Sequence, residues 1–374
     1  MRLAALVAAI AIMGCGRIGF DADGARDGGI RIDGPATFPG GSPTVRQRLD
    51  LDRFSADEAL TNFPLLVQMT GSRVDGATLG DSSTVRFRDS SGAVIPHEID
   101  DRIDNSYGRF WVRVPRYAGT SSFIFVEYGG TPVAASTDNV WSEGYFGVWH
   151  LQSASPIDDS SSVHRATQSV GSTPPLSGFF GAGLAFDSTD AADYLRIDGT
   201  TGGLAEITMS AWFNSDMPST GGNGTSALVT REFADDGDDD FWLGLDDADR
   251  TSMGIATGAS TEYAEGSPVS FGTWTHLVGT WSTATGKAEL YENGERVGGI
   301  DISGSAVVDS SHPIFIGGGH NDIVGVHDDA DNDYFDGVID EVRLASRART
   351  PAWVAAEHAS ETDAAITYGP IERL

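Results

Sequence analysis

The chain is poor in residues that cross-link, bind nucleic acid or cross membranes. Its 374 residues include one cysteine, Cys15, so no disulfide can form within it. Lysine and arginine number 24 against 54 aspartates and glutamates, and the formal charge of −30 opposes binding to nucleic acid or to an anionic lipid surface. No stretch approaches the ~18 apolar residues of a membrane-spanning helix. Stability must therefore come from a packed core or from bound metal.

Common catalytic motifs are also missing. The chain has no Gly-x-Ser-x-Gly turn and no phosphate-binding glycine loop ending in Lys-Ser or Lys-Thr, and His97-Glu98 lacks the second histidine of a zinc hydrolase. No Glu-x-Asp-x-Glu triplet directs carboxylates to one face of a strand, as glycosidases on jelly-roll folds require. Asp340 and Glu341 are adjacent, so an ordinary strand would point them to opposite faces. We therefore expect a protein that is not an enzyme.

The N-terminal residues predict export. Arg2 precedes a dozen apolar or small residues that end at Cys15, a run typical of a secretory signal. The sequence Ile12-Met13-Gly14-Cys15 resembles the bacterial lipobox, although Met13 replaces the usual small residue. We expect a signal peptide at residues 1–14, lipidation of Cys15 and a disordered Gly/Asp-rich tether at residues 15–44. The expected location is the cell envelope, at the outer membrane or cell surface through the lipid anchor only, with a secreted or periplasmic protein as the alternative.

Two β-rich regions follow the tether. Residues 45–140 contain six short alternating segments without a helix signal, which predicts a small β-sandwich. Residues 141–370 contain more than ten candidate strands, which predicts two stacked antiparallel sheets. Asn293-Gly294 marks a tight hairpin between Lys287–Glu292 and Glu295–Ile300. The one expected helix of the body is Thr350–Ala359, with Thr350 as its cap. The fold class is all-β.

Several motifs in order carry a family resemblance. They are Gly147–Leu151, Asp159-Ser160-Ser161, Gly183–Asp187, Thr208–Trp212, Trp274–Val278, Leu290–Gly294 and Phe335–Leu344. Residues 145–360 thereby resemble a bacterial laminin G-like, concanavalin A-like jelly roll, with Ser162 in place of an expected glycine. Residues 46–140, with Phe63–Val67, Ile95–Ile99 and Phe110–Val114, resemble a bacterial domain of unknown function that often precedes such jelly rolls. Neither resemblance implies an activity.

Aspartates suggest structural calcium at two places. The resemblance implies a site that uses Asp159 and Asp340. Alternation along the expected strand Val338–Leu344 also places Asp340 on the face of Val338, Val342 and Leu344. We expect this face to be buried, and a carboxylate there needs a partner. Asp329, Asp331 and Asp333 have the alternating spacing of a calcium loop, without its sixth-position glycine and twelfth-position glutamate. The alternatives are a solvated acidic loop and a hydrogen-bonded structural aspartate.

Aromatic residues near loops indicate where a glycan could bind. The candidates are Trp242, Tyr263, Trp281 and His320, whereas Trp212 and Trp274 are expected in the core. The function expected is a lipid-anchored envelope protein whose jelly roll binds carbohydrate. The alternative is an adhesion scaffold that binds envelope or extracellular proteins. A third possibility is an accessory part of a carbohydrate-active enzyme system. No nucleic-acid partner is expected.

Overall fold

The computed structural model describes residues 43–53, 58–79, 82–104, 107–119, 122–132, 140–153, 157–163, 167–188, 193–199, 203–218, 224–231, 240–257, 261–302, 313–318 and 333–374. The predicted signal peptide, Cys15 and most of the predicted tether lie outside them. In the described part of the chain, no helix combines the length and the apolar character needed to cross a membrane.

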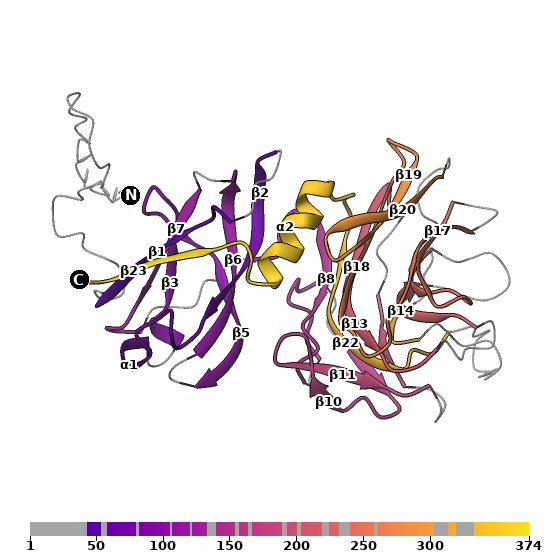
Figure 1. Cartoon of the computed structure of the whole chain (residues 1–374), viewed down its shortest axis with the longest axis horizontal. Helices are drawn as coiled ribbons and strands as arrows, with labels where there is room; N and C mark the ends of the chain where they lie inside the picture. Colours follow the sequence, from indigo (N-terminus) through magenta and orange to yellow (C-terminus); the bar gives the residue numbers. More distant parts are fainter. Residues whose placement is uncertain are drawn as a thin grey trace, which may run out of the picture. The chain divides into compact units, whose positions relative to one another are not determined.

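The first β-rich region forms two sheets (Figure 1). Its described residues make a five-stranded sheet in the order β23-β1-β7-β3-β4, with bounds Thr367–Arg373, Val45–Asp50, Phe123–Tyr128, Arg86–Arg88 and Val94–Ile95. A three-stranded sheet has the order β2-β6-β5, with bounds Leu60–Met69, Tyr107–Tyr117 and His97–Asp104. A short helix, α1 (Gly76–Leu79), and a 3-10 turn at Ser82–Thr84 lie between β2 and β3 along the chain.

The second region forms two larger antiparallel sheets (Figure 1). The first, called here the C-sheet, has the strand order β10-β11-β22-β13-β18-β19-β20. In the same order, the strand bounds are Pro175–Ser177, Ala182–Phe186, Gly337–Ala345, Glu206–Ser215, Thr275–Ser282, Lys287–Glu292 and Glu295–Asp301. Strand β8 (Tyr145–Trp149) also pairs with β22. The second, the D-sheet, runs β17-β16-β15-β14-β21-β12-β9, with bounds Thr261–Pro268, Arg250–Ala256, Phe241–Leu245, Ser226–Arg231, Ile314–Ile316, Tyr194–Ile197 and Thr167–Val170. The all-β prediction is confirmed.

Two local predictions are confirmed in detail. Asn293 and Gly294 have φ angles of 51° and 85°, so the turn between β19 and β20 has the two positive φ values of a type I′ hairpin. Helix α2 (Pro351–Glu361) begins after Thr350, whose side chain accepts a hydrogen bond from the Trp353 amide. Both features depend on residues within one turn of each other, which explains why the sequence predicts them well.

One hydrophobic core fills the space between the C-sheet and the D-sheet. Alternate residues of each strand point inward, among them Leu195, Phe213, Leu243, Met253 and Leu277, all essentially inaccessible to solvent. The outer face of the C-sheet is also covered. Its Trp212 belongs to a second buried cluster that includes Phe63, Trp111 and Trp141 from or next to the first region. The aromatic junction around Trp141 is therefore packed.

Helix α2 joins the two regions. On one side, Trp353 meets Phe63 of β2 edge to face at 5.1 Å between ring centroids, and Ser360 accepts a hydrogen bond from the Leu66 amide. On the other side, Val354 packs with Val278 and Tyr291 of the C-sheet. After α2 the chain returns to the first region, where β23 pairs with β1. The domain boundary expected at residue 140 gave no indication that the C-terminal strand joins the five-stranded sheet of the first region.

Candidate functional site

A pocket lies on the outer face of the D-sheet, opposite its hydrophobic core. Its volume is about 340 Å³, and it is lined by Trp242 of β15, Ser252 of β16, Tyr263 and Glu265 of β17, and Thr225, Asp246, Asp247 and Asp333 from adjoining segments. The structure thus brings together three residues that the sequence had indicated separately, Trp242, Tyr263 and Asp333. We call this group of eight residues the aromatic pocket.

Strand alternation explains how the two rings reach this face. Phe241, Leu243 and Leu245 point into the core, so Trp242, which lies between the first two, points outward. On β16 and β17, Met253, Ile255 and Ala264 face the core in the same way, and Tyr263 faces out. The Trp242 and Tyr263 rings meet edge to face, with centroids 6.2 Å apart.

Two glycines leave room for these rings. A Cβ atom at Gly244 would lie 2.8 Å from Cζ2 of Trp242, and one at Gly254 would lie 2.7 Å from Cε1 of Tyr263. At Gly254 a larger residue would displace the Tyr263 ring, and at Gly244 its Cβ would first meet the Ser226 backbone oxygen at 2.1 Å. Trp242 is only 5% exposed and its Nε1 makes no hydrogen bond among the described residues, whereas Tyr263 is 47% exposed. Tyr263 is therefore the ring most available to a ligand.

The pocket is acidic. Asp246 accepts hydrogen bonds from the Ala248 and Arg250 amides and pairs with the Arg250 guanidinium at 2.8 Å. The same guanidinium pairs with Glu265 at 2.8 Å. Asp333 accepts a hydrogen bond from the Thr225 hydroxyl, and Asp247 is exposed. Four carboxylates thus line a space beside one guanidinium, and each can accept hydrogen bonds from a hydroxyl or amino group.

The other residues proposed for ligand or metal binding fall elsewhere. Trp281 is fully buried in the core between the sheets and takes no part in the pocket, which corrects the expectation that it contacts a ligand. Trp281 lies inside β18 (Thr275–Ser282), four residues after Leu277 and on the same face, so strand alternation directs it into the core and not to a loop. His320, Asp329 and Asp331 lie outside the described residues, as Cys15 does.

Asp340 is buried, but on the face opposite to the one predicted. Along β22, Trp212 pairs with Asp340 and Ser210 with Arg343, so Glu341 and Val342 together oppose Ala211. This extra residue is a β-bulge, and the φ angle of 52° at Glu341 marks it. The bulge reverses the alternation, so Val342 and Leu344 face the core while Asp340 faces the covered outer side of the C-sheet.

The two aspartates of the predicted calcium site are both tied to backbone amides. Asp340 Oδ2 accepts a hydrogen bond from the Phe180 amide at 2.9 Å, while Oδ1 makes none with the described residues. Burial and the nearby Glu341 carboxylate raise the pKa of Asp340 well above its usual value. Asp159 accepts from the amides of Val148 and Ser161 at 2.8 Å. Calcium at Asp159 and Asp340 remains a prediction.

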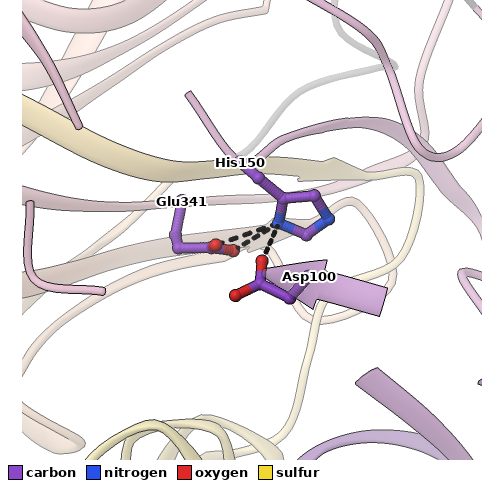
Figure 2. Close-up of side chains that lie close together, drawn as sticks. All are labelled: Asp100, His150 and Glu341. Carbon is purple, nitrogen blue, oxygen red and sulfur yellow. Dashed lines mark hydrogen bonds and ion pairs between the residues drawn. The ribbon is translucent and has the colours of Figure 1, made fainter. Parts of the chain in front are cut away.

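A buried ionic cluster joins the first region to the C-sheet (Figure 2). It consists of His150, which follows β8, Asp100 of β5 and Glu341 of β22. His150 Nδ1 lies 2.9 Å from both Glu341 carboxylate oxygens and 3.6 Å from Asp100, and its Nε2 lies 2.8 Å from Glu98. Burial alone would lower the pKa of His150, but Glu341, Glu98 and Asp100 outweigh it and raise the pKa well above its usual value. His150 thus pairs with a carboxylate from each region, Glu98 from the first and Glu341 from the C-sheet.

Arg343 extends this cluster toward helix α2. Its guanidinium pairs with Glu341 and Glu357, each at 2.7 Å, and with Glu361. It also lies 4.5 Å from the centre of the Trp111 ring. Arg343 carries one positive charge beside three buried carboxylates, of which Glu341 is also paired with His150. Burial raises the pKa of Glu361 to about 8 despite Arg343, whereas His150 and Arg343 outweigh burial at Glu341 and lower its pKa to about 2.

No motif in the sequence identifies this cluster. A weak signal was present, because His150 stands inside the apolar run Gly147–Leu151 and Glu341 inside an apolar strand. A second group, His276 with Glu357 and Glu361, also gathers possible metal ligands. Burial and nearby cations lower the pKa of His276 well below its usual value, and Arg343 already binds both glutamates. We interpret both groups as part of the joint between the two regions.

Comparison with known families confirms the jelly-roll prediction. Residues 188–355 match the family model described as the concanavalin A-like lectin/glucanases superfamily, which is less than half of the chain. No curated protein matches the sequence.

Solved structures with a similar fold are distant in sequence. The binding domain of Paraclostridial Mosquitocidal Protein 1 is 13% identical, with a TM-score of 0.45 over 58% of this chain and 52% of that one. Domain 4 of AbnA, an arabinanase from Geobacillus stearothermophilus, is 17% identical, with a TM-score of 0.40 over 60% and 100%. A pentraxin from Limulus polyphemus is 17% identical, with a TM-score of 0.37 over 46% and 78%. This chain spans about half the length of the first of these, and the likeness concerns the fold alone.

Proposed function

We propose that this chain, whose residues 188–355 belong to the concanavalin A-like lectin/glucanase superfamily, is a non-catalytic glycan-binding protein of the cell envelope. The observation that carries the proposal is the aromatic pocket. It joins an exposed tyrosine ring, a tryptophan and several hydrogen-bond acceptors on one face of the D-sheet. An apolar ring against which a sugar can pack, with polar groups at its edge, is the usual composition of a carbohydrate site.

Replacement of the exposed ring tests this proposal. We expect Tyr263→Ala to lower the affinity for a bound glycan about tenfold, or ~1.4 kcal/mol, because the sugar loses its apolar contact. Tyr263 is half exposed, so the variant should still fold. The measurement is a glycan array followed by calorimetry with the best neutral, amino-bearing or acidic oligosaccharide.

A matched control is available on the same domain. Phe271 is 40% exposed and does not line the pocket, so Phe271→Ala removes a similar ring from another surface. We expect it to leave glycan affinity unchanged. Equal losses in the two variants would contradict the assignment of the pocket. Capture of an envelope protein without any glycan signal would favour the scaffold alternative.

We further propose attachment to the envelope through a lipid on Cys15. The support is the apolar run that ends at this cysteine. We expect Cys15→Ser to abolish partition into the detergent phase, because the acylated thioether cannot form without sulfur. Detergent phase separation of extracts from cells that express either form measures the partition. Ser42→Ala is a control substitution in the predicted tether. A mutant that still enters the detergent phase would refute the anchor.

A further inference from the structure

We infer that the aromatic pocket binds an amino sugar, that is, a glycan unit with a free, protonated amino group. The inference rests on the proposed glycan-binding function and specifies its ligand class. Charge is the first argument. Asp246 and Asp247 come from the turn between β15 and β16, Glu265 from β17 and Asp333 from the segment before β22. Acidic side chains from three segments thus converge on one space.

Positive charge near the pocket is limited. Among the described residues that contact its carboxylates, Arg250 is the basic one, and it is shared between Asp246 and Glu265 at 2.8 Å each. Within the described part of the chain, four carboxylates line this space beside one guanidinium, which leaves an excess of negative charge. A cationic ligand would be attracted, and a sialic acid or uronic acid would be repelled.

The rings favour the same kind of ligand. An ammonium group is attracted to the electron-rich face of tyrosine or tryptophan, and recognition of ammonium groups between aromatic and acidic side chains rests on this attraction. Tyr263 offers the exposed ring, and Glu265 lies two residues from it on β17, so both side chains stand on the same face. Ring and carboxylate are therefore within reach of one sugar unit.

Two oligosaccharides that differ only at the amino group test the inference. Chitosan oligomers carry free amines, and chitin oligomers of equal length carry neutral acetamides. We expect the intact protein to bind the chitosan oligomer at least about tenfold more tightly at mildly acidic pH and low salt. This preference should shrink as salt is added, whereas the affinity for chitin oligomers should change little. All titrations contain EDTA, so that no metal ion screens the pocket.

Two substitutions test whether the preference for the chitosan oligomer arises in the aromatic pocket. Asp247→Asn removes one pocket charge at an exposed position and should reduce the chitosan preference several-fold. Asp301→Asn removes an exposed charge at the end of β20, outside the pocket, and should leave it unchanged. Equal binding of the two oligomers, tighter binding of a sialylated glycan, or equal effects of the two substitutions would overturn the inference.

The results also separate this inference from the proposed function. If neutral glycans bind and Tyr263→Ala weakens them without any amino preference, the glycan-binding function stands and the amino-sugar inference fails. If Tyr263→Ala leaves the affinity of every bound glycan unchanged, the pocket assignment itself fails.

Discussion

Arg343→Met should destabilise the protein by about 3–5 kcal/mol, because it leaves buried carboxylates without their cation. Arg343 is 2% exposed and pairs with Glu341, Glu357 and Glu361, which come from β22 and helix α2. Methionine retains much of the aliphatic length against Trp111, so the change mainly removes the charge. The measurement is the free energy of unfolding from urea titration at neutral pH.

A surface arginine provides the matched control for this substitution. Arg296 on β20 pairs with Glu289 at 3.0 Å, and its side chain is 52% exposed. Arg296→Met should cost less than about 1 kcal/mol, since water screens an exposed pair. A loss as small as this in Arg343→Met would show that the buried cluster does not depend on its arginine. Adding Glu357→Gln to Arg343→Met should recover part of the loss, because it removes one of the buried carboxylates that lose their cation.

Glu361 should make stability fall as pH rises from about 4.5 to about 8. Its pKa is raised from 4.5 to about 8 in the folded protein because it is buried and lies near Glu357, despite Arg343. Between these values the folded state holds a proton that the unfolded state has released, so unfolding becomes more favourable with rising pH. The shift corresponds to roughly 5 kcal/mol across the window.

The variant Glu361→Gln tests this pH dependence. Glutamine cannot ionise, so the free energy of unfolding of the variant should lack this pH dependence. The difference in free energy of unfolding between the wild type and the variant should therefore shrink by several kcal/mol between pH 5 and about 8. Glu372→Gln, at an exposed position of β23, controls for the loss of one negative charge. Urea titrations across this range measure the difference. Parallel curves for the wild type and Glu361→Gln would contradict the raised pKa.

Interactions between residues that are close in the sequence were sufficient to predict much of the fold. The hairpin at Asn293-Gly294 and the cap at Thr350 each depend on neighbouring residues, and both are confirmed. Family motifs spread over residues 145–360 added the jelly-roll assignment, which the match at residues 188–355 confirms.

Only the tertiary structure decided which polar residues meet. The bulge at Glu341 adds one residue to β22, and because side chains alternate with a period of two, it moved Asp340 to the other face. His150 and Glu98 are 52 positions apart, and their contact depends on the packing of the first region against the C-sheet. The sequence did not connect three of the candidate site residues, which are Trp242, Tyr263 and Asp333. Pairing of β15, β16 and β17, with glycines beneath the rings, made them one pocket.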